Sequence, residues 1–484
     1  MKYFSTRNTK EVVSSAEAIV KGLASDGGLF VPECLPAVNA EGWSALSYPE
    51  LAAEILPYLL EDFDKEFLKK ATKEAYGEAF NGKAGYTEKV KEGMYALELW
   101  HGPTCAFKDY ALQLMPRLLV EAKRMLGRSE RTRILVATSG DTGKAALEGY
   151  KNLEGIDIHV FYPNDGTSEI QRLQMASQEG SNVGVYAVEG NFDDAQSGVK
   201  RVFADKEVAA KLEENNIRLS SANSINWGRL VPQIVYYFYS YYRVLEREKL
   251  PEGTVLDYCV PTGNFGDILA GYYAKQMGLP IGKLICASNK NNVLADFLKT
   301  GIYDKKRTFY KTGSPSMDIL ISSNLERLLY HVTKDPDKVA GWMKDLAEKG
   351  EYAVDKETLD ALQEDFDGGW ADEETCANVI AHYNKEHHYL ADTHTAVAFA
   401  VADQKKSDAA MVVLSTASPY KFPRVVLEAL GMEVPVSDFD AIEMLEKFSG
   451  MKASENLVNL KGMNERFKEM IAPEQIAEVA LQKC

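Results

Sequence analysis

One lysine in the chain stands where its amine could become a nucleophile. Lys108 follows Ala106 and Phe107, shortly after a Gly-Pro break at residues 102–103. A lysine amine reacts only after it loses its proton, and its unperturbed pKa is about 10.4. Burial among apolar side chains lowers that pKa, so a buried Lys108 could form a Schiff base with an aldehyde. A solvated surface charge is the common alternative for any single lysine.

A glycine-containing turn further along the chain is suited to hold a phosphate group. Residues 255–260 are predicted to form a buried strand, and a helix is expected from about residue 267 onward. The turn between them consists of Thr262, Gly263, Asn264, Phe265, Gly266 and Asp267. Free N–H groups in such a turn point at one spot, where the helix dipole adds about half a positive charge. Because the spacing is not that of a dinucleotide-binding motif, a tight turn without a ligand remains an alternative.

Two further polar turns follow segments that we predict to be strands. Residues 134–138 lead into the first, and residues 411–415 lead to Thr416. The first turn consists of Ser139, Gly140, Asp141, Thr142 and Gly143. Ligands of open α/β sheets bind outside the carboxyl ends of the strands, so both turns are candidate binding elements. Helix capping is the alternative role for the first turn, and a plain strand position is the alternative for Thr416.

The segment of residues 223–229 adds an amide and a guanidinium group, from Asn226 and Arg229. A guanidinium can hold a phosphate through two parallel hydrogen bonds. Arg229 is therefore a candidate ligand for an anionic substrate, with a surface ion pair as the alternative.

The elements that must position these turns alternate between strand and helix. The predicted strands are residues 134–138, 156–162, 183–188, 255–260, 284–288 and 411–415. Such alternation favours parallel pairing, with helices on both faces of an α/β sheet. Residues 1–95 are predicted to be a separate, mostly helical portion. Residues 290–385 are predicted to be a helical insertion, and the last 40 residues also favour helix.

The composition is that of an ordinary globular protein. The chain has 484 residues, of which 45% are hydrophobic and 26% charged, so about three domains are expected. Its net charge of −16 disfavours nucleic acid and membranes as partners, and no signal peptide or long apolar run is visible. The six cysteines are scattered, which favours a reducing cytoplasm. His387, His388 and His394 lack zinc-site spacing, so we predict no metal and expect structural or solvent-exposed histidines.

Taken in order, these segments resemble the threonine synthase family. The family's members are pyridoxal-phosphate enzymes of fold type II, the tryptophan-synthase-β-like fold. The clearest motifs are His-Gly-Pro-Thr-Cys-Ala-Phe-Lys-Asp at 101–109, Thr-Ser-Gly-Asp-Thr-Gly at 138–143 and Pro-Thr-Gly-Asn-Phe-Gly-Asp at 261–267. The resemblance extends over nearly the whole chain, through residues 22–32, 188–196, 223–229, 316–327, 392–396 and 415–419.

The resemblance implies a fold with two doubly wound α/β domains and an N-terminal, mostly helical domain. Residues 1–95 would form the N-terminal domain. Residues 96–130 and 250–484 would form the large pyridoxal-phosphate-binding domain, and residues 131–249 the small α/β domain.

The resemblance also assigns roles to individual residues. Lys108 would be the catalytic residue that forms the Schiff base with pyridoxal 5'-phosphate, and Thr416 would face the pyridine nitrogen. The cofactor phosphate would be framed by Thr262, Gly263, Asn264, Phe265, Gly266 and Asp267. The residues expected near the substrate are Ser139, Asp141, Thr142, Asn226 and Arg229.

The reaction that the resemblance implies converts O-phospho-L-homoserine and water to L-threonine and phosphate, by γ-elimination and β-addition. Lys108 would take the Cα proton and return protons in later steps. One alternative is another fold-type-II lyase, such as a dehydratase or phospho-lyase, and a less favoured one is a non-catalytic phosphometabolite-binding protein. A cytoplasmic monomer or homodimer is expected.

Overall fold

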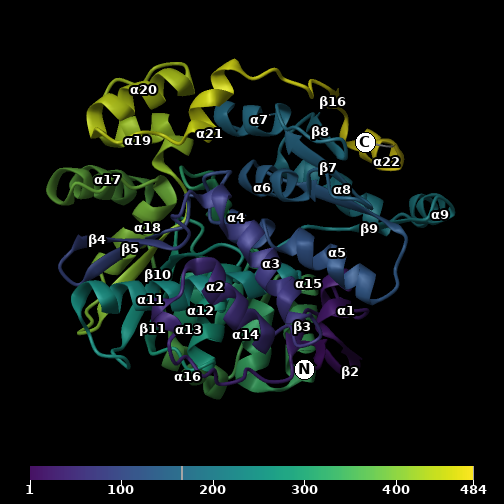
Figure 1. The fold of residues 1–484 in the computed structure, drawn as a ribbon, viewed down its shortest axis with the longest axis horizontal. Helices are drawn as coiled ribbons and strands as arrows, with labels where there is room; N and C mark the ends of the chain where they lie inside the picture. The colour runs from purple at the N-terminus through teal and green to yellow at the C-terminus, as the bar shows by residue number, and fades with distance from the viewer. Residues whose placement is uncertain (165–166, 483–484) are drawn as a thin grey trace.

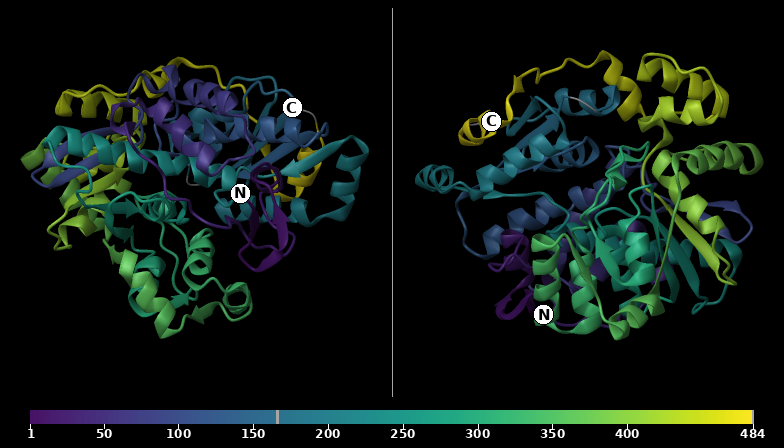
Figure 2. Two further views of the ribbon diagram at one scale, coloured as in Figure 1. Left: turned by 60° about the horizontal axis from the view of Figure 1, so that its bottom comes forward. Right: turned by 180° about the vertical axis from the view of Figure 1, so that it is seen from behind.

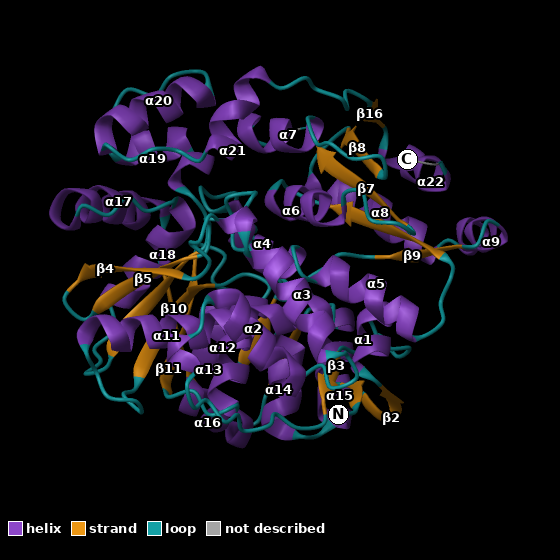
Figure 3. Cartoon of the chain, in the orientation of Figure 1, coloured by secondary structure: helices purple, strands orange, loops and turns teal. Residues whose placement is uncertain are grey.

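Two sheets of mostly parallel strands dominate the computed structural model, which describes residues 1–164 and 167–482 (Figure 1; Figure 3). The larger sheet has the order β14 (Phe366–Trp370), β11 (Ile281–Ser288), β10 (Leu256–Pro261), β15 (Ala410–Ser415), β5 (Met94–Glu98) and β4 (Tyr86–Lys91). Its strands pair in parallel, except that β4 is antiparallel to β5. The smaller sheet is parallel, in the order β16 (Met470–Ile471), β8 (Val183–Val188), β7 (Ile156–Pro163), β6 (Arg131–Ala137) and β9 (Ile217–Ser220).

The larger sheet is buried on both faces. Alternate residues of each strand point to opposite faces, and each set of side chains packs in its own apolar cluster. Tyr258 and Val260 of β10 lie in one apolar cluster with residues of α11 (Ile234–Glu248) and α12 (Gly266–Gln276). Cys259, between them, lies in a second cluster with residues of α18 (Thr393–Asp403). The near-continuous apolar runs predicted to be strands are thus explained by two covered faces.

The smaller sheet is covered in the same way. Val136 and Val160 pack in a cluster with residues of α6 (Asp141–Tyr150), while Leu135 and Phe161 pack with α8 (Phe192–Ala204) and α22 (Ile476–Leu481). The other helices associated with this half of the molecule are α7 (Glu169–Ala176) and α9 (Lys206–Glu214). The six predicted strands are all present, and β8 has the predicted range of 183–188.

The N-terminal portion contains strands as well as helices. A three-stranded antiparallel sheet is formed by β1 (Tyr3–Ser5), β2 (Asn8–Val13) and β3 (Phe30–Pro32), and the helices are α1 (Ser15–Lys21), α2 (Tyr48–Ile55) and α3 (Lys65–Tyr76). β4 and β5 belong to the larger sheet, so the boundary predicted at residue 95 falls inside β5. The short β5 gave no signal in the sequence, because its strand character depends on pairing with β15.

The predicted insertion of residues 290–385 is helical in large part but also supplies a strand to the larger sheet. Its helices are α13 (Val293–Thr300), α14 (Leu325–Thr333), α15 (Pro336–Glu348), α16 (Lys356–Asp365) and α17 (Glu373–His387). They are joined by a small pair of antiparallel strands, β12 (Ile302–Asp304) and β13 (Glu351–Ala353). In the left view of Figure 2 much of this segment forms a lobe at the bottom of the molecule, while β14 pairs with β11.

The C-terminal segment runs from the larger half of the molecule to the smaller sheet (Figure 2, right). It contains α19 (Pro423–Ala429), α20 (Asp438–Ser449) and α21 (Glu455–Val458) before β16 and α22. β16 pairs in parallel with β8, and α22 packs on α8. We predicted that all residues from 250 to 484 belong to the large domain; in the structure β16 and the buried apolar residues of α22 lie against the smaller sheet.

Phe399 provides a test of how strongly α18 is anchored. Its ring is fully buried and stacks on Tyr383, with ring centroids 4.3 Å apart. Phe399→Ala should lower the free energy of unfolding by about 3–5 kcal/mol, because the removed ring leaves a cavity. Urea denaturation measures this change, with Val436→Ala at a 93% exposed position as the control. A loss equal to that of the control would contradict the packing described.

Candidate active site

Lys108 lies in a largely enclosed position between the two sheets. It is the first residue of α4 (Lys108–Leu112), and its side chain is 11% exposed. Nζ donates to Ser316 Oγ at 3.3 Å and lies 3.9 Å from Asp141 Oδ2. Burial lowers the pKa of the Lys108 amine, although the Asp141 carboxylate opposes this shift. Lys108 is therefore not a solvated surface charge, and its amine is favourably placed for nucleophilic chemistry.

The glycine turn at the start of α12 approaches the same point from the other side. A Cβ atom on Gly263 would lie only 2.9 Å from the carbonyl oxygen of Ser316, so glycine is needed for this close approach. Ser316 thus contacts both the Lys108 amine and the turn. The predicted nucleophile and the predicted phosphate-binding turn belong to one site.

Three consecutive polar residues fix the shape of this turn. Ser322 Oγ donates to the Gly263 carbonyl at 2.9 Å, and Ser323 Oγ donates to Asn264 Oδ1 at 3.1 Å. The Asn264 carbonyl accepts from the backbone and side-chain amides of Asn324 at 3.1 and 3.0 Å. Within the described part of the chain, the N–H groups of residues 263–265 donate to no protein acceptor. The turn is therefore rigid, and its amides are available to an anion.

The other residues of the turn have distinct roles. Thr262 continues β10, because its N–H donates to Ala287 O at 2.9 Å. Phe265 has a positive φ of 65° and buries its ring against Phe366, so only its backbone can serve a ligand. Asp267 is buried in the first turn of α12, and burial raises the pKa of its carboxyl group to about 6.

The turn after β6 presents a carboxylate to Lys108. The amides of Gly140 and Gly143 both donate to Thr138 Oγ1 at 3.0 Å, so Thr138 satisfies the start of α6. Asp141 does not cap the helix, and its carboxylate instead accepts from Gln171 Nε2 at 2.9 Å. Burial alone would raise the pKa of Asp141, but the ammonium groups of Lys421 and Lys108 lower it overall. Ser139 and Thr142 lie half-buried beside it.

Arg229 is a buried arginine in α10 (Trp227–Leu230), and it forms no ion pair with a carboxylate of the described residues. Nη1 donates to the Ala222 carbonyl, while Nε has no protein partner. Burial lowers the pKa of its guanidinium to about 10, and its charge in turn helps to lower the pKa of Lys108. The alternative of a surface ion pair is excluded for Arg229. A buried guanidinium without a counter-ion is suited to bind an anion.

Asn226 is occupied by structural contacts. Its side-chain oxygen accepts from the Gly228 amide at 2.8 Å, which caps α10, and its Nδ2 donates to Ile19 O at 2.9 Å. Asn226 therefore orients the helix that carries Arg229.

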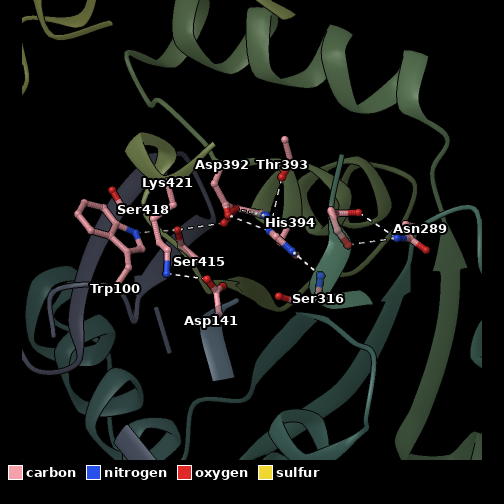
Figure 4. Close-up of polar contacts among 12 residues, drawn as sticks. Trp100, Asp141, Asn289, Ser316, Asp392, Thr393, His394, Ser415, Ser418 and Lys421 are labelled. Carbon is pink, nitrogen blue, oxygen red and sulfur yellow. Dashed lines mark hydrogen bonds and ion pairs between the residues drawn. The ribbon is translucent and has the colours of Figure 1, made fainter. Parts of the chain in front are cut away.

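Thr416 lies directly beside the segment that carries Lys108. It follows β15, is buried, and its carbonyl accepts from the Phe107 amide at 2.8 Å. Ser415, the last residue of the strand, accepts from Trp100 Nε1 at 3.1 Å and from Thr395 Oγ1 at 3.1 Å (Figure 4).

Two residues of the site were assigned no role from the sequence, and Figure 4 places both among its polar contacts. His394 is buried on α18, and its Nε2 accepts from the Ser316 amide at 3.2 Å, so one histidine at least belongs to the site. Lys421 is fully buried, and its Nζ lies 2.6 Å from Asp141 Oδ1. Lys421 lies within the third polar turn, residues 415–422, but only the fold brings it to Asp141.

Other kinds of site receive no support from the described residues. No cluster of three or more histidine, cysteine, aspartate or glutamate side chains among them could hold a metal ion. None of the helices in residues 1–164 and 167–482 combines the length and apolar character needed to cross a bilayer.

Three family models match consecutive parts of the chain. Residues 2–76 match the threonine synthase N terminus, residues 84–416 match a pyridoxal-phosphate dependent enzyme, and residues 395–479 match the threonine synthase C-terminal region.

Individual relatives give the same result over most of the chain. Threonine synthase from Pseudomonas aeruginosa is 39% identical, covering 92% of this chain and 94% of the relative. Threonine synthase from Eremothecium gossypii is 38% identical, covering 88% of this chain and 89% of the relative. The crystal structure of pyridoxal-phosphate-bound threonine synthase from Brucella melitensis superimposes with a TM-score of 0.88 at 37% identity, over 99% of both chains. The chain belongs to the threonine synthase family of pyridoxal-phosphate-dependent enzymes with fold type II.

Proposed function

We propose that this protein converts O-phospho-L-homoserine and water to L-threonine and phosphate, with pyridoxal 5'-phosphate attached to Lys108. The observation that carries the proposal is the meeting of a buried lysine amine and a glycine turn at Ser316. Arg229, a buried cation without a carboxylate partner in the described chain, supports a second anion site.

The residues around Lys108 fit this cofactor. The covalent link needs an amine that can exist without its proton, which burial of Lys108 favours. The cofactor phosphate needs amides at a helix N terminus, which residues 263–265 offer at the start of α12. We assign the phosphate contacts to Gly263, Asn264, Phe265 and Gly266 through their backbone, with Thr262 and Asp267 framing the turn. Thr416, beside Phe107, is assigned to the ring nitrogen.

The protein's own groups supply the proton transfers and the binding of charge. Pyridoxal phosphate, when bound, contributes an aldehyde for attachment and a conjugated ring that accepts electrons from the substrate Cα. With cofactor and substrate bound, Nζ of Lys108 would be the base that takes the Cα proton, and it would later return protons to the product. Ser316 Oγ orients this amine, and burial of the site limits the entry of water other than the reactant.

The departing phosphate group requires a cationic side chain whose charge is not already paired with a carboxylate of the protein. We assign this role to Arg229, with hydroxyl contacts from Ser139 and Thr142. Asn226 supports Arg229 by capping α10, and Asp141 stands at the Lys108 amine. The acidic chain is proposed to act in the cytoplasm, as a monomer or homodimer, without nucleic acid or membrane partners.

The product formed from O-phospho-L-homoserine tests the reaction. Purified protein with pyridoxal phosphate should release threonine and inorganic phosphate in equal amounts, as measured by chromatography and a phosphate assay. Formation of 2-oxobutyrate would favour a dehydratase or phospho-lyase. A protein that binds the substrate without turnover would favour the binding-protein alternative.

Lys108→Ala should abolish covalent attachment of the cofactor, because no other group would hold the aldehyde. After borohydride reduction, peptide mass spectrometry should find the added mass on Lys108 in the unmodified protein and nowhere in the variant. Lys91→Ala is the control, since this half-buried lysine pairs with Asp403 away from the site. Label retained at another lysine in the Lys108 variant would contradict the assignment.

Arg229→Gln should weaken substrate binding much more than cofactor binding. A buried charged contact to phosphate is worth about 2–5 kcal/mol, so KM should rise by at least ~30-fold. Steady-state kinetics and cofactor titration measure the two effects, with Arg124→Gln at an exposed ion pair as the control. Equal loss of both affinities would remove Arg229 from the substrate site.

A further inference from the structure

We propose that Lys421 is a positioning residue that occupies the Asp141 carboxylate, so that the neighbouring Lys108 amine need not keep a proton. The inference rests on the proposed role of Lys108 as the attachment point. It adds a residue to which no role was assigned from the sequence.

Lys421 joins three parts of the site without touching solvent. It is the last residue of a short 3-10 turn (Pro419–Lys421) after β15, and it is 0% exposed. Its Nζ lies 2.6 Å from Asp141 Oδ1 and donates to the Thr104 carbonyl at 3.0 Å. Asp141 begins a helix of the smaller sheet, whereas Lys421 follows a strand of the larger one. The pair therefore connects the two sheets next to Lys108.

Two lysines share one carboxylate in this group. Asp141 is a single buried carboxylate with two lysines beside it, Lys421 at 2.6 Å and Lys108 at 3.9 Å. Because Lys421 is closer and fully buried, it neutralises Asp141. A proton on Lys108 would then give two cations for one carboxylate in a desolvated site, which is unfavourable. Without Lys421, Asp141 would have Lys108 as its nearest cation and would hold the proton on it.

Other charged groups around this centre act on the Lys108 amine in both directions. Arg229 is a further cation that opposes protonation of Lys108, while Asp267 favours it. Asp109 follows Lys108 and accepts from the amide and hydroxyl of Thr104 at 2.9 and 2.7 Å. His394 accepts from the Ser316 amide through Nε2 at 3.2 Å. Lys421 remains the group closest to Asp141.

The protonation state of Lys108 can be measured through its reaction with the cofactor. The neutral amine adds to the aldehyde carbon, a C=N bond forms, and one water molecule leaves, with no change in oxidation state. Only the unprotonated amine reacts, so the rate of imine formation by cofactor-free protein rises with pH around a midpoint that reports Lys108. Stopped-flow absorbance between pH 6 and 10, with pyridoxal 5'-phosphate as the probe, gives this midpoint.

Two substitutions should move the midpoint in opposite directions. Lys421→Met should raise it by about 1–3 pH units, because Lys108 becomes the only close cation of Asp141. Asp141→Asn should lower it, because the carboxylate that favours the proton is gone. The double variant should return toward the value of the unmodified protein. A purely structural role for Lys421 predicts reduced stability with an unchanged midpoint.

Lys123→Met is a matched control for the loss of a buried lysine. Lys123 is 7% exposed and donates to Glu130 O and Thr132 Oγ1, away from the site. It should lower the melting temperature without moving the midpoint. If Lys421→Met does not fold, Asp141→Asn alone decides, since an unchanged or raised midpoint overturns the inference. An imine that forms at another lysine in the unmodified protein would overturn the proposed attachment and this inference together.

Discussion

A lysine amine that attacks an aldehyde has to be buried so that it can lose its proton. In a buried site, however, the charges of neighbouring groups are poorly screened and act strongly on the amine. In its proposed role, Lys108 meets this constraint at the junction of two sheets, where Ser316 accepts from its Nζ and Asp141 lies 3.9 Å away. An unpaired carboxylate buried in such a place would cost free energy, and it would favour the protonated form of the amine. Lys421 offsets that charge from the opposite side. The arrangement of the surrounding turns follows from keeping these three groups together.

The sequence predicted the elements whose character is local. Residues 183–188 are apolar and β-branched, and they form β8 over the same range. The turn at 262–267 combines a strand, two glycines and a helix start, and it has the expected form. β5 escaped prediction because a five-residue segment gains strand structure only from its neighbours β15 and β4. β5 and β16 each pair with a strand far away in sequence, β15 and β8, and no local pattern indicates such pairing.

The parts of the candidate site that lie in local motifs could be predicted from the sequence. The parts that depend on an ion pair between residues far apart in the chain could not. Lys108 and Gly263 stand in recognisable motifs, and Ser316 connects them. Lys421 lies in the third polar turn, but nothing local indicates its contact, which is with a residue 280 positions earlier in the chain. The proposed roles of Ser139, Thr142 and Thr416 stay predictions, since they concern bound molecules. Asn226 has a second role that its motif did not suggest, because its Nδ2 contacts the N-terminal segment at Ile19.

The return of the chain end to the smaller sheet has a consequence for biosynthesis. β16, at Met470–Ile471, covers one edge of β8, whose own residues are made almost three hundred positions earlier. A ribosome exposes the chain from its N terminus, so this edge stays uncovered until residues 470–471 have been made. An open strand edge is a template for unwanted pairing with other chains. Chains that are truncated before residue 470 therefore expose an unpaired edge of β8, and we expect chaperones or proteases to bind them.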